Sequence, residues 1–201
     1  MTNILTHTLP AKVETENGIF EPVTDFRASI EFEIMVDNGE QDIFKLMKPY
    51  YPNGLPKQAA DAINAAVWFY KCGDESKEQK ENKPLRNNKR AYSFSFDAEA
   101  IYSDFSRYYN IDLTSAKLHW WKFRALLSGL PTESTFKERI YYRTCDLKGL
   151  PKKEQKRICE IRKLIEIKTE DDAQKISLEK RNADMLAYVQ KRQKETNKGV
   201  Q

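Results

Sequence analysis

The sequence predicts an all-α protein: an irregular bundle of about seven or eight helices with a short irregular lead-in at the N-terminus. Hydrophobic residues make up 40% of the 201-residue chain and charged residues 32%, a profile typical of helical proteins with charged surfaces. Only seven glycines occur, which also argues against a sandwich or barrel. Through most of the chain, apolar residues recur every three or four positions, the spacing of one helix face.

The predicted lead-in and a small helical unit occupy residues 1–73. In the first 23 residues, two prolines and a glycine among scattered apolar residues indicate an irregular or hairpin-like segment. A helix capped by Thr24 or Asp25 follows, because apolar residues recur at every fourth position from Phe26 to Ile34. The Asn-Gly pair after it predicts its end.

Two further helices complete this unit. The run QDIFKLMKPYY predicts a short helix that ends before Pro49. The alanine-rich run PKQAADAINAAVWFYKCG predicts a longer helix, with Pro56 in its first turn and Gly73 at its end.

A charged stretch separates this unit from the next. Leu85 is the only apolar residue from 74 to 90, and so polar a stretch cannot bury enough apolar surface to offset the entropy of ordering it. We therefore predict a charged mobile loop over residues 74–91, a central helical core over 92–168, and a basic C-terminal helix and tail over 169–201.

Five helices are predicted after this loop, each from a capping residue or an apolar repeat: Asp97–Tyr109, 115–128, 135–143, 152–168 and about 170–193. The second of these is capped by Thr114. The third opens on a capping box that runs from Thr135 to Glu138, with Phe136, Ile140 and Arg143 on one stripe.

A three-residue repeat, Gly-Leu-Pro, occurs at 54–56, 129–131 and 149–151, each time between predicted helices. Glycine suits the left-handed conformation just after a helix, and proline suits the first turn of the next one. The repeat therefore predicts punctuation between helices and not a phosphate-binding loop.

Charge is unevenly distributed along the chain. Residues 1–150 carry 20 Lys and Arg against 21 Asp and Glu, whereas residues 151–201 carry 14 against 9. The basic part permits an acidic partner, although its interleaved signs are also typical of a solvated helix surface. The candidate basic interaction surface consists of six side chains: Lys152, Lys153, Lys156, Arg157, Arg162 and Lys163.

The sequence contains no recognisable disulfide, metal-binding, membrane-spanning or catalytic motif. Three cysteines without CxxC spacing suggest neither a disulfide framework nor a zinc site, and they fit a reducing cytosol. No long apolar run or signal peptide occurs, which argues against membrane spanning and secretion. With two histidines and no nucleotide-binding, metalloprotease or hydrolase motif, the sequence predicts no catalytic, cofactor-binding or metal site.

The run LHWWKFRALLSGLP, residues 118–131, holds the most informative side chains. On a helical wheel it is apolar on most sides, with a narrow polar stripe that includes Arg124. A nucleic-acid stacking surface would instead expose aromatic rings beside a basic face. We therefore predict a central helix with Trp120 and Trp121 in the core.

Two polar residues of this helix need partners. His119 lies among apolar positions and is predicted to be a buried, hydrogen-bonded histidine. His7 is the only other histidine, so the sequence offers no evident two-histidine metal pair and no evident base beside a nucleophile. For Arg124, a buried ion pair with Asp25, Asp112 or Asp146 that fixes the helix register is the favoured interpretation. Direct partner binding by Arg124 is the alternative.

Several of these motifs together resemble one family. They are DFR at 25–27, FSRYYNIDLT at 105–114, LHWWKFRALLSGLP at 118–131, and the pattern Phe136, Ile140, Arg143, Asp146, Leu147. Roughly residues 24–150 are similar to the bacteriophage gene-product-fifteen family, tail-module proteins of siphophages and prophages that are regarded as similar to tail-assembly chaperones. The candidate family-core or partner-binding residues are Asp25, Arg27, Trp120, Trp121, Arg124, Arg143 and Asp146.

The resemblance implies a non-enzymatic assembly factor in the cytoplasm of the infected bacterium. Such a factor would keep the long tape measure protein soluble while tail tube subunits polymerise around it, and it could form a homo-oligomer. A structural tail component is a related alternative. From the residues alone, a small nucleic-acid-binding regulator that uses the basic cluster is the second interpretation.

Overall fold

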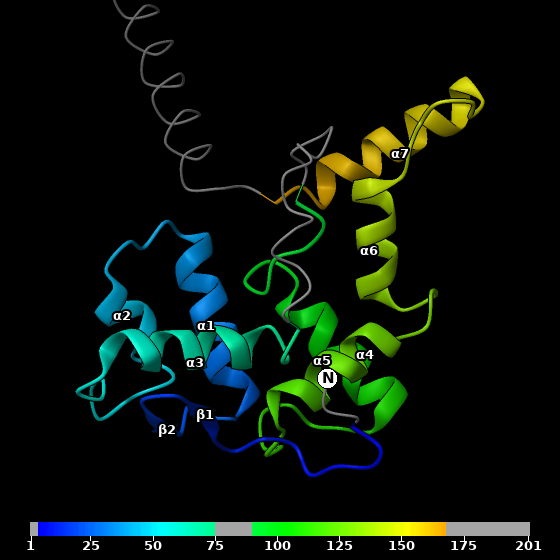
Figure 1. Cartoon of the computed structure of the whole chain (residues 1–201). Coiled ribbons are helices and arrows are strands. Elements are labelled where there is room, and N and C mark those ends of the chain that lie inside the picture. The colour runs from blue at the N-terminus through cyan, green and yellow to red at the C-terminus, as the bar shows by residue number, and fades with distance from the viewer. Residues whose placement is uncertain (1–3, 75–89, 168–201) are drawn as a thin grey trace, which may run out of the picture. The chain divides into compact units, whose positions relative to one another are not determined.

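The structure of the protein is a computed structural model, and it describes residues 4–74 and 90–167. Within these residues it contains a two-stranded hairpin and seven helices (Figure 1). The strands are β1 (Val13–Thr15) and β2 (Gly18–Phe20). The helices are α1 (Phe26–Asp37), α2 (Ile43–Met47), α3 (Ala59–Tyr70), α4 (Ala98–Tyr109), α5 (Trp120–Gly129), α6 (Thr135–Thr144) and α7 (Lys152–Leu164).

The predicted helical class is confirmed in its main feature, but the protein is not strictly all-α. The lead-in forms an antiparallel hairpin in which Val13 faces Phe20, and both of these side chains are buried. Asn17, at the turn, donates a hydrogen bond to Asp61 of α3 at 3.0 Å. The hairpin thus belongs to the core. The predicted helix at 170–193 and residues 75–89 of the predicted loop lie outside the described residues.

The N-terminal helices begin at carboxylate caps. Asp25 precedes α1 and accepts a hydrogen bond from the Arg27 backbone N–H at 3.0 Å. Asp42 does the same for α2, where it accepts from the Phe44 backbone N–H at 2.9 Å. Gly39 follows α1 with a φ of 77°, the left-handed conformation that the Asn-Gly pair predicts.

The prediction that Thr114 caps the next helix is wrong, because α5 begins at Trp120 with His119 as its cap. Thr114 instead donates to Asp112 from both its backbone N–H and its hydroxyl, at 2.9 and 2.7 Å. The Thr114 and Ala116 carbonyls accept from the side chain of Arg27, at 3.1 and 3.2 Å. This long-range contact holds the segment in a non-helical path, and no local pattern reveals it.

Two other helix starts differ from the predictions. The cap of α6 is Ser134, one residue earlier than the predicted Thr135, and its hydroxyl accepts from the Lys137 backbone N–H. Helix α3 begins at Ala59 and not at Pro56, because Gln58 has a non-helical ψ of 67°. The first difference is a single residue, within the usual variation of helix ends. The second is three residues, within the uncertainty of helix ends predicted from sequence.

The Gly-Leu-Pro repeat has two structural roles. Gly54 and Gly149 lie in turns with φ values of 99° and 83°, as the punctuation interpretation predicts. Gly129 differs, since it is the last residue of α5 and has no positive φ.

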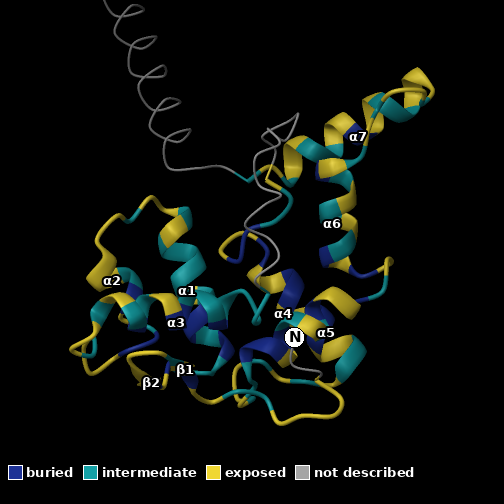
Figure 2. Ribbon diagram, viewed as in Figure 1, coloured by how far each residue is buried: buried dark blue, intermediate teal, exposed yellow. Residues whose placement is uncertain are grey.

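One hydrophobic core draws side chains from both sides of the segment 75–89. Buried rings from α1, α3, α4, α5 and α6 meet there: Phe26, Phe69, Phe105, Trp120, Phe123 and Phe136. Figure 2 shows the buried residues on the sides where these helices face one another. Residues up to Glu166 form one compact unit. Helix α7 belongs to this unit and packs on α6, with Ile158 buried.

Candidate functional site

The tryptophan pair is buried at the start of α5, with 0% of Trp120 and 6% of Trp121 exposed. The two indole N–H groups donate to adjacent carbonyls at the end of α3. Trp120 Nε1 lies 2.9 Å from the Tyr70 oxygen, and Trp121 Nε1 lies 2.8 Å from the Phe69 oxygen. The last carbonyls of a helix lack partners within it. The adjacent tryptophans therefore cap α3 and join it to α5.

Ring stacking completes this centre. The Trp120 ring stacks with both Tyr70 and Phe123, with centroid distances of 5.7 Å to each and interplanar angles of 16° and 15°. Phe123 stacks in turn on Phe26 at 4.8 Å and on Phe105 at 5.1 Å. The tryptophans are therefore core residues, as the apolar wheel predicts, and they offer no exposed surface on which bases could stack.

The DFR motif ties α1 to the segment before α5. Asp25 caps α1 and pairs with Arg27, whose Nη1 lies 3.0 Å from its Oδ1. The Arg27 guanidinium also donates to three main-chain carbonyls, those of Leu113, Thr114 and Ala116, at 2.7, 3.1 and 3.2 Å. A planar fork with five N–H donors suits such a cluster of acceptors. The motif is thus a structural clip between distant parts of the chain.

His119 is partly buried and has both ring nitrogens in use. Its Nδ1 accepts from the Trp121 backbone N–H at 3.1 Å, which caps α5. A backbone N–H can only donate, so Nδ1 must be unprotonated, and Nε2 carries the hydrogen that it donates to the Pro10 oxygen at 3.1 Å. Burial lowers the pKa of His119, and this outweighs the opposite effect of the Pro10 contact. The neutral ring is therefore the form that fits.

The prediction of a buried ion pair at Arg124 is wrong. Its guanidinium carbon lies 5.4 Å from the centroid of the Trp120 ring, a cation–π contact. The three predicted carboxylate partners have other roles. Asp25 pairs with Arg27, while Asp112 and Asp146 accept hydrogen bonds in local turns.

A buried ion pair is found instead at Arg143. Its Nη1 and Nη2 donate to Asp97 at 2.6 and 2.9 Å, and 6% of Arg143 and 0% of Asp97 are exposed. Arg139 adds a third contact to Asp97 at 3.1 Å. Burial alone would raise the pKa of Asp97, but the hydrogen bonds from Arg143, Ser93 and Arg139 hold it below its usual value. The sequence predicts Asp97 only as the first residue of a helix and not as the partner of Arg143.

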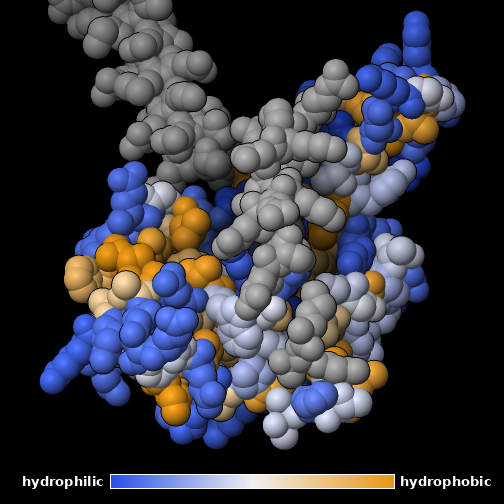
Figure 3. Space-filling model, viewed as in Figure 1, coloured by the Kyte–Doolittle hydropathy of each residue, from blue (hydrophilic) through white to orange (hydrophobic). Residues whose placement is uncertain are grey.

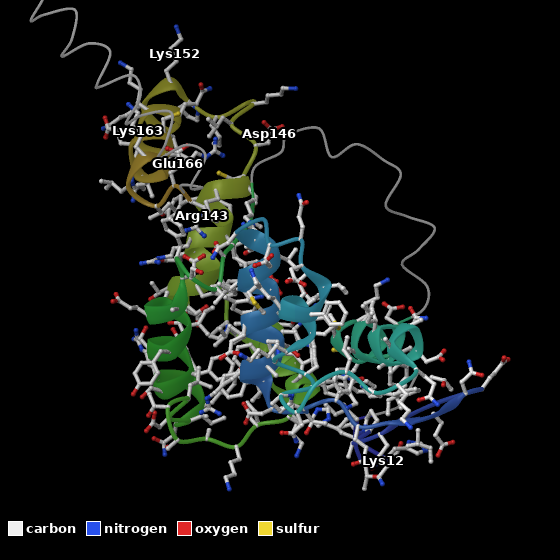
Figure 4. The ribbon with its side chains drawn as sticks, turned by 90° about the vertical axis from the view of Figure 1, so that its left-hand side faces the viewer. Lys12, Arg143, Asp146, Lys152, Lys163 and Glu166 are labelled. Atoms are coloured by element: carbon white, nitrogen blue, oxygen red, sulfur yellow. The ribbon has the colours of Figure 1, made fainter. Side chains whose placement is uncertain are left out.

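Arg143 also connects segments that are distant in sequence. Its Nε donates to the Ile165 carbonyl at 2.8 Å, and its Nη1 donates to the Ala91 carbonyl at 3.2 Å. In Figure 4 it lies on α6, between α7 and the rest of the unit. Asp146, the neighbouring candidate, is exposed and caps a turn through the Lys148 backbone N–H. Arg143 is thus a structural connector, and Asp146 takes no part in its contacts.

A second buried carboxylate, Asp104, is not predicted from the sequence. Asp104 of α4 is 2% exposed and accepts from the backbone N–H groups of Thr135 and Phe136, at 3.2 and 2.8 Å. It supplies acceptors to the first turn of α6 from a different helix. The only sequence signal was a carboxylate on the otherwise apolar face of α4, between Ile101 and Phe105.

This chain matches the model of a known protein family over most of its length. The family model described as Bacteriophage Gp15 protein matches residues 5–168. The chain belongs to the Bacteriophage Gp15 protein family. The resemblance carried by the DFR and tryptophan motifs is thereby confirmed. No match was found among curated proteins or among solved structures.

Most of the predicted basic surface of this Gp15 chain is exposed. We define the α7 face as its exposed cationic side chains: Lys152, Lys153, Lys156, Arg157 and Lys163. Figure 4 shows Lys152 and Lys163 on this helix. The sixth predicted residue, Arg162, is half-buried and donates to the carbonyls of Tyr142 and Cys145. Arg162 therefore holds α7 against α6 and does not form part of the exposed surface.

An exposed apolar surface lies at α2 and the adjoining end of α1. We define the α2 patch as Val36, Ile43 and Phe44, which are 48%, 38% and 69% exposed. Hydrophobic side chains gather over α1 and α2 in Figure 3. The sequence predicts only that these positions lie in helices. Aromatic and aliphatic side chains exposed together are typical of protein-binding surfaces.

The described residues show no arrangement for catalysis on a metal. In the ranges 4–74 and 90–167, no three His, Cys, Asp or Glu side chains come together as a metal site requires. None of the helices in these ranges combines the length and hydropathy needed to cross a bilayer. The arrangement that the described residues do offer is two exposed surfaces of different chemistry, the α2 patch and the α7 face.

Proposed function

We propose that this protein is a non-enzymatic phage tail assembly factor that acts in the host bacterial cytoplasm, where it binds the tape measure protein and helps assembly of the tail tube. Membership of the Gp15 family over residues 5–168 is the observation that carries this proposal. The exposed α2 patch supports it, because a factor that keeps an aggregation-prone partner soluble needs an apolar contact surface.

The chemistry of the α2 patch fits an amphipathic helix. Such a helix presents an apolar stripe that binds to exposed apolar side chains on its receptor. Phe44 is the largest exposed apolar side chain of the patch, and aromatic side chains often contribute most of the binding energy of an interface. Asp42 and Lys45, on either side of it, keep the surroundings polar and therefore the free protein soluble.

Co-expression with the tape measure protein of the same phage tests this function. We expect more soluble tape measure protein in the presence of this chain, and a loss of the effect with Ile43→Ser/Phe44→Ser. Ile19→Ser is the matched control, since Ile19 is also an exposed apolar residue, at 60%, but lies on the hairpin. Equal solubility with and without the wild-type protein would reject the proposal.

A nucleic-acid-binding regulator is the second candidate function, and the exposure of the α7 face favours it. Five cationic side chains on one helix can contact phosphates, and such binding weakens steeply with salt. Glu154 and Glu160 interrupt the same helix, however, and repel phosphate. Retention on DNA or RNA that is lost at high salt and in a variant with Gln at these five positions would support this function over the first. A structural tail component would instead remain in purified virions.

A further inference from the structure

The two segments that contain the α2 patch and the α7 face have net charges of opposite sign. The segment from 31 to 48, which contains the α2 patch, has five carboxylates and two lysines. The segment from 146 to 166, which contains the α7 face, has seven lysines and arginines and four carboxylates. Asp37 pairs with Arg90 and Glu40 pairs with Lys45, and with Arg90 included the segment from 31 to 48 still has a net negative charge. The negative segment around the α2 patch and the positive segment around the α7 face therefore attract each other.

The side chains on α7 form two lines along the helix. At 100° per residue, Lys152, Lys156 and Lys163 fall within 40° of one another. Beside them, Lys153, Arg157 and Leu164 also fall within 40°, and Leu164 is 85% exposed. The α7 face therefore combines a cationic line with an exposed apolar side chain at its C-terminal end.

We propose that the α7 face of one copy of this protein docks on the α2 patch of a second copy. In this contact Leu164 packs against the apolar side chains around Phe44, while the lysines of the α7 face lie opposite the carboxylates of the α1–α2 region. Lysine faces repel each other, so two α7 faces cannot pair. The contact is therefore heterologous, with different surfaces of the two copies in contact.

A second copy fits better than a nucleic acid at this helix. Glu160 lies beside the lysine line and would repel a phosphate, whereas in a protein contact it can pair with the exposed Lys48 near the α2 patch. No aromatic side chain is present on α7 for base stacking. A contact between Leu164 and Phe44 would also bury apolar surface that is exposed in the single copy. A phosphate backbone offers no apolar surface for such a contact.

Sedimentation of the full-length protein over a range of concentrations and salt tests the proposal independently of any tail partner. We expect reversible self-association that weakens as salt rises, because exposed charges are screened. Phe44→Ser and the triple variant Lys152→Glu/Lys156→Glu/Lys163→Glu should each raise the dissociation constant roughly tenfold or more. Matched controls are Ile19→Ser and Lys57→Glu/Lys117→Glu/Lys122→Glu, which change exposed residues elsewhere and should associate like the wild type.

Mixing the two variants gives the decisive result. Phe44→Ser retains its α7 face, and the triple variant retains its α2 patch, so an equimolar mixture should form a one-to-one complex although each variant alone does not associate. A wild-type protein that stays monomeric, or a mixture that stays monomeric, would overturn the proposal. Binding of fluorescent single-stranded DNA to a monomeric wild type, lost in the triple variant, would assign the α7 face to nucleic acid and overturn it as well.

Discussion

At the level of single residues, the main polar feature of this protein is the carboxylate of Asp97. It is fully buried and accepts hydrogen bonds from two arginines and the Ser93 backbone N–H. A charge taken out of water is tolerated only when such partners surround it. Arg143, its main partner, also binds two carbonyls from other segments. Loss of Asp97 would therefore leave Arg143 buried without its counter-charge.

We predict that Asp97→Asn lowers the free energy of unfolding by about 3–5 kcal/mol, the usual cost of breaking a buried ion pair from one side. The pKa of Asp97 is depressed in the folded protein. Its contribution is therefore present above the unfolded carboxyl pKa of about 3.9 and is lost as the pH falls through the lower folded value. Denaturant unfolding at neutral and acid pH measures both effects. Asp146→Asn, at an exposed carboxylate, should change stability by less than about 0.5 kcal/mol.

His119 gives a second pH dependence, at milder acidity. Its folded pKa is lowered, so the unfolded chain binds the proton more readily and stability falls as the pH drops below about 6.5. We predict that His119→Asn removes this part of the pH profile, because asparagine can still cap α5 but does not titrate. Thermal unfolding between neutral and mildly acid pH checks this. His7→Asn is the control, and a profile altered equally by both variants would contradict the assignment.

At the level of helices, the tryptophan pair explains how α3 and α5 are joined. Both indoles donate to the last carbonyls of α3 while their rings pack in the centre of the core. A position of this kind combines a large buried area with a specific hydrogen bond. Substitution of Trp120 should reduce stability by two mechanisms together, the formation of a cavity and the loss of the hydrogen bond to the Tyr70 carbonyl.

We predict that Trp120→Ala lowers the free energy of unfolding by about 3–5 kcal/mol. Trp120→Phe should cost less, since it keeps an aromatic ring in the stack and loses the hydrogen bond to the Tyr70 carbonyl and only part of the buried ring volume. Denaturant unfolding followed by circular dichroism measures both. Lys122→Ala, at an exposed position of the same helix, controls for helix propensity. A Trp120→Ala protein as stable as the wild type would show that the indole is not in the core.

Arg27 makes the corresponding connection for α1. We predict that Arg27→Ala lowers stability by about 1–2 kcal/mol, a modest value because the side chain is partly exposed, and that Arg27→Lys does not restore it. A single ammonium group cannot span the three carbonyls that the guanidinium binds. Hydrogen exchange of the 113–119 segment should accelerate in both variants. Protection unchanged in Arg27→Lys would mean that charge alone holds the segment.

The same elements show what the sequence can and cannot predict. The spacing of apolar residues located all seven described helices and placed Trp120 in the core, because burial of one helix face leaves a local periodic signal. The predicted start of the helix that contains Trp120 was wrong because hydrogen bonds from Arg27, almost ninety positions away, hold residues 113–116 in a non-helical path. Likewise, the sequence did not predict that Asp97 is the partner of Arg143, because the two residues are 46 positions apart and meet only through the tertiary structure. Long-range polar contacts leave no spacing in the sequence.

At the level of the whole molecule, the two exposed surfaces have linked consequences. The proposed tape-measure contact and the proposed self-contact both use the α2 patch. Two ligands that need the same surface exclude each other, so binding of one weakens the apparent affinity for the other. Self-association would then cover Phe44 in the absence of a partner, and the partner would have to displace a neighbouring α7 face. The proposed self-contact would thus protect an apolar surface from non-specific aggregation.

We therefore predict that an amphipathic segment of the tape measure protein converts self-associated protein into one-to-one complexes. Light scattering during titration should show the mean mass of the assemblies fall as the segment is added. The triple variant Lys152→Glu/Lys156→Glu/Lys163→Glu lacks the competing contact, so it should bind the segment more tightly than the wild type, whereas Phe44→Ser should bind it more weakly. If the segment binds while the self-associated mass stays constant, the two contacts use different surfaces, and Phe44 cannot serve both.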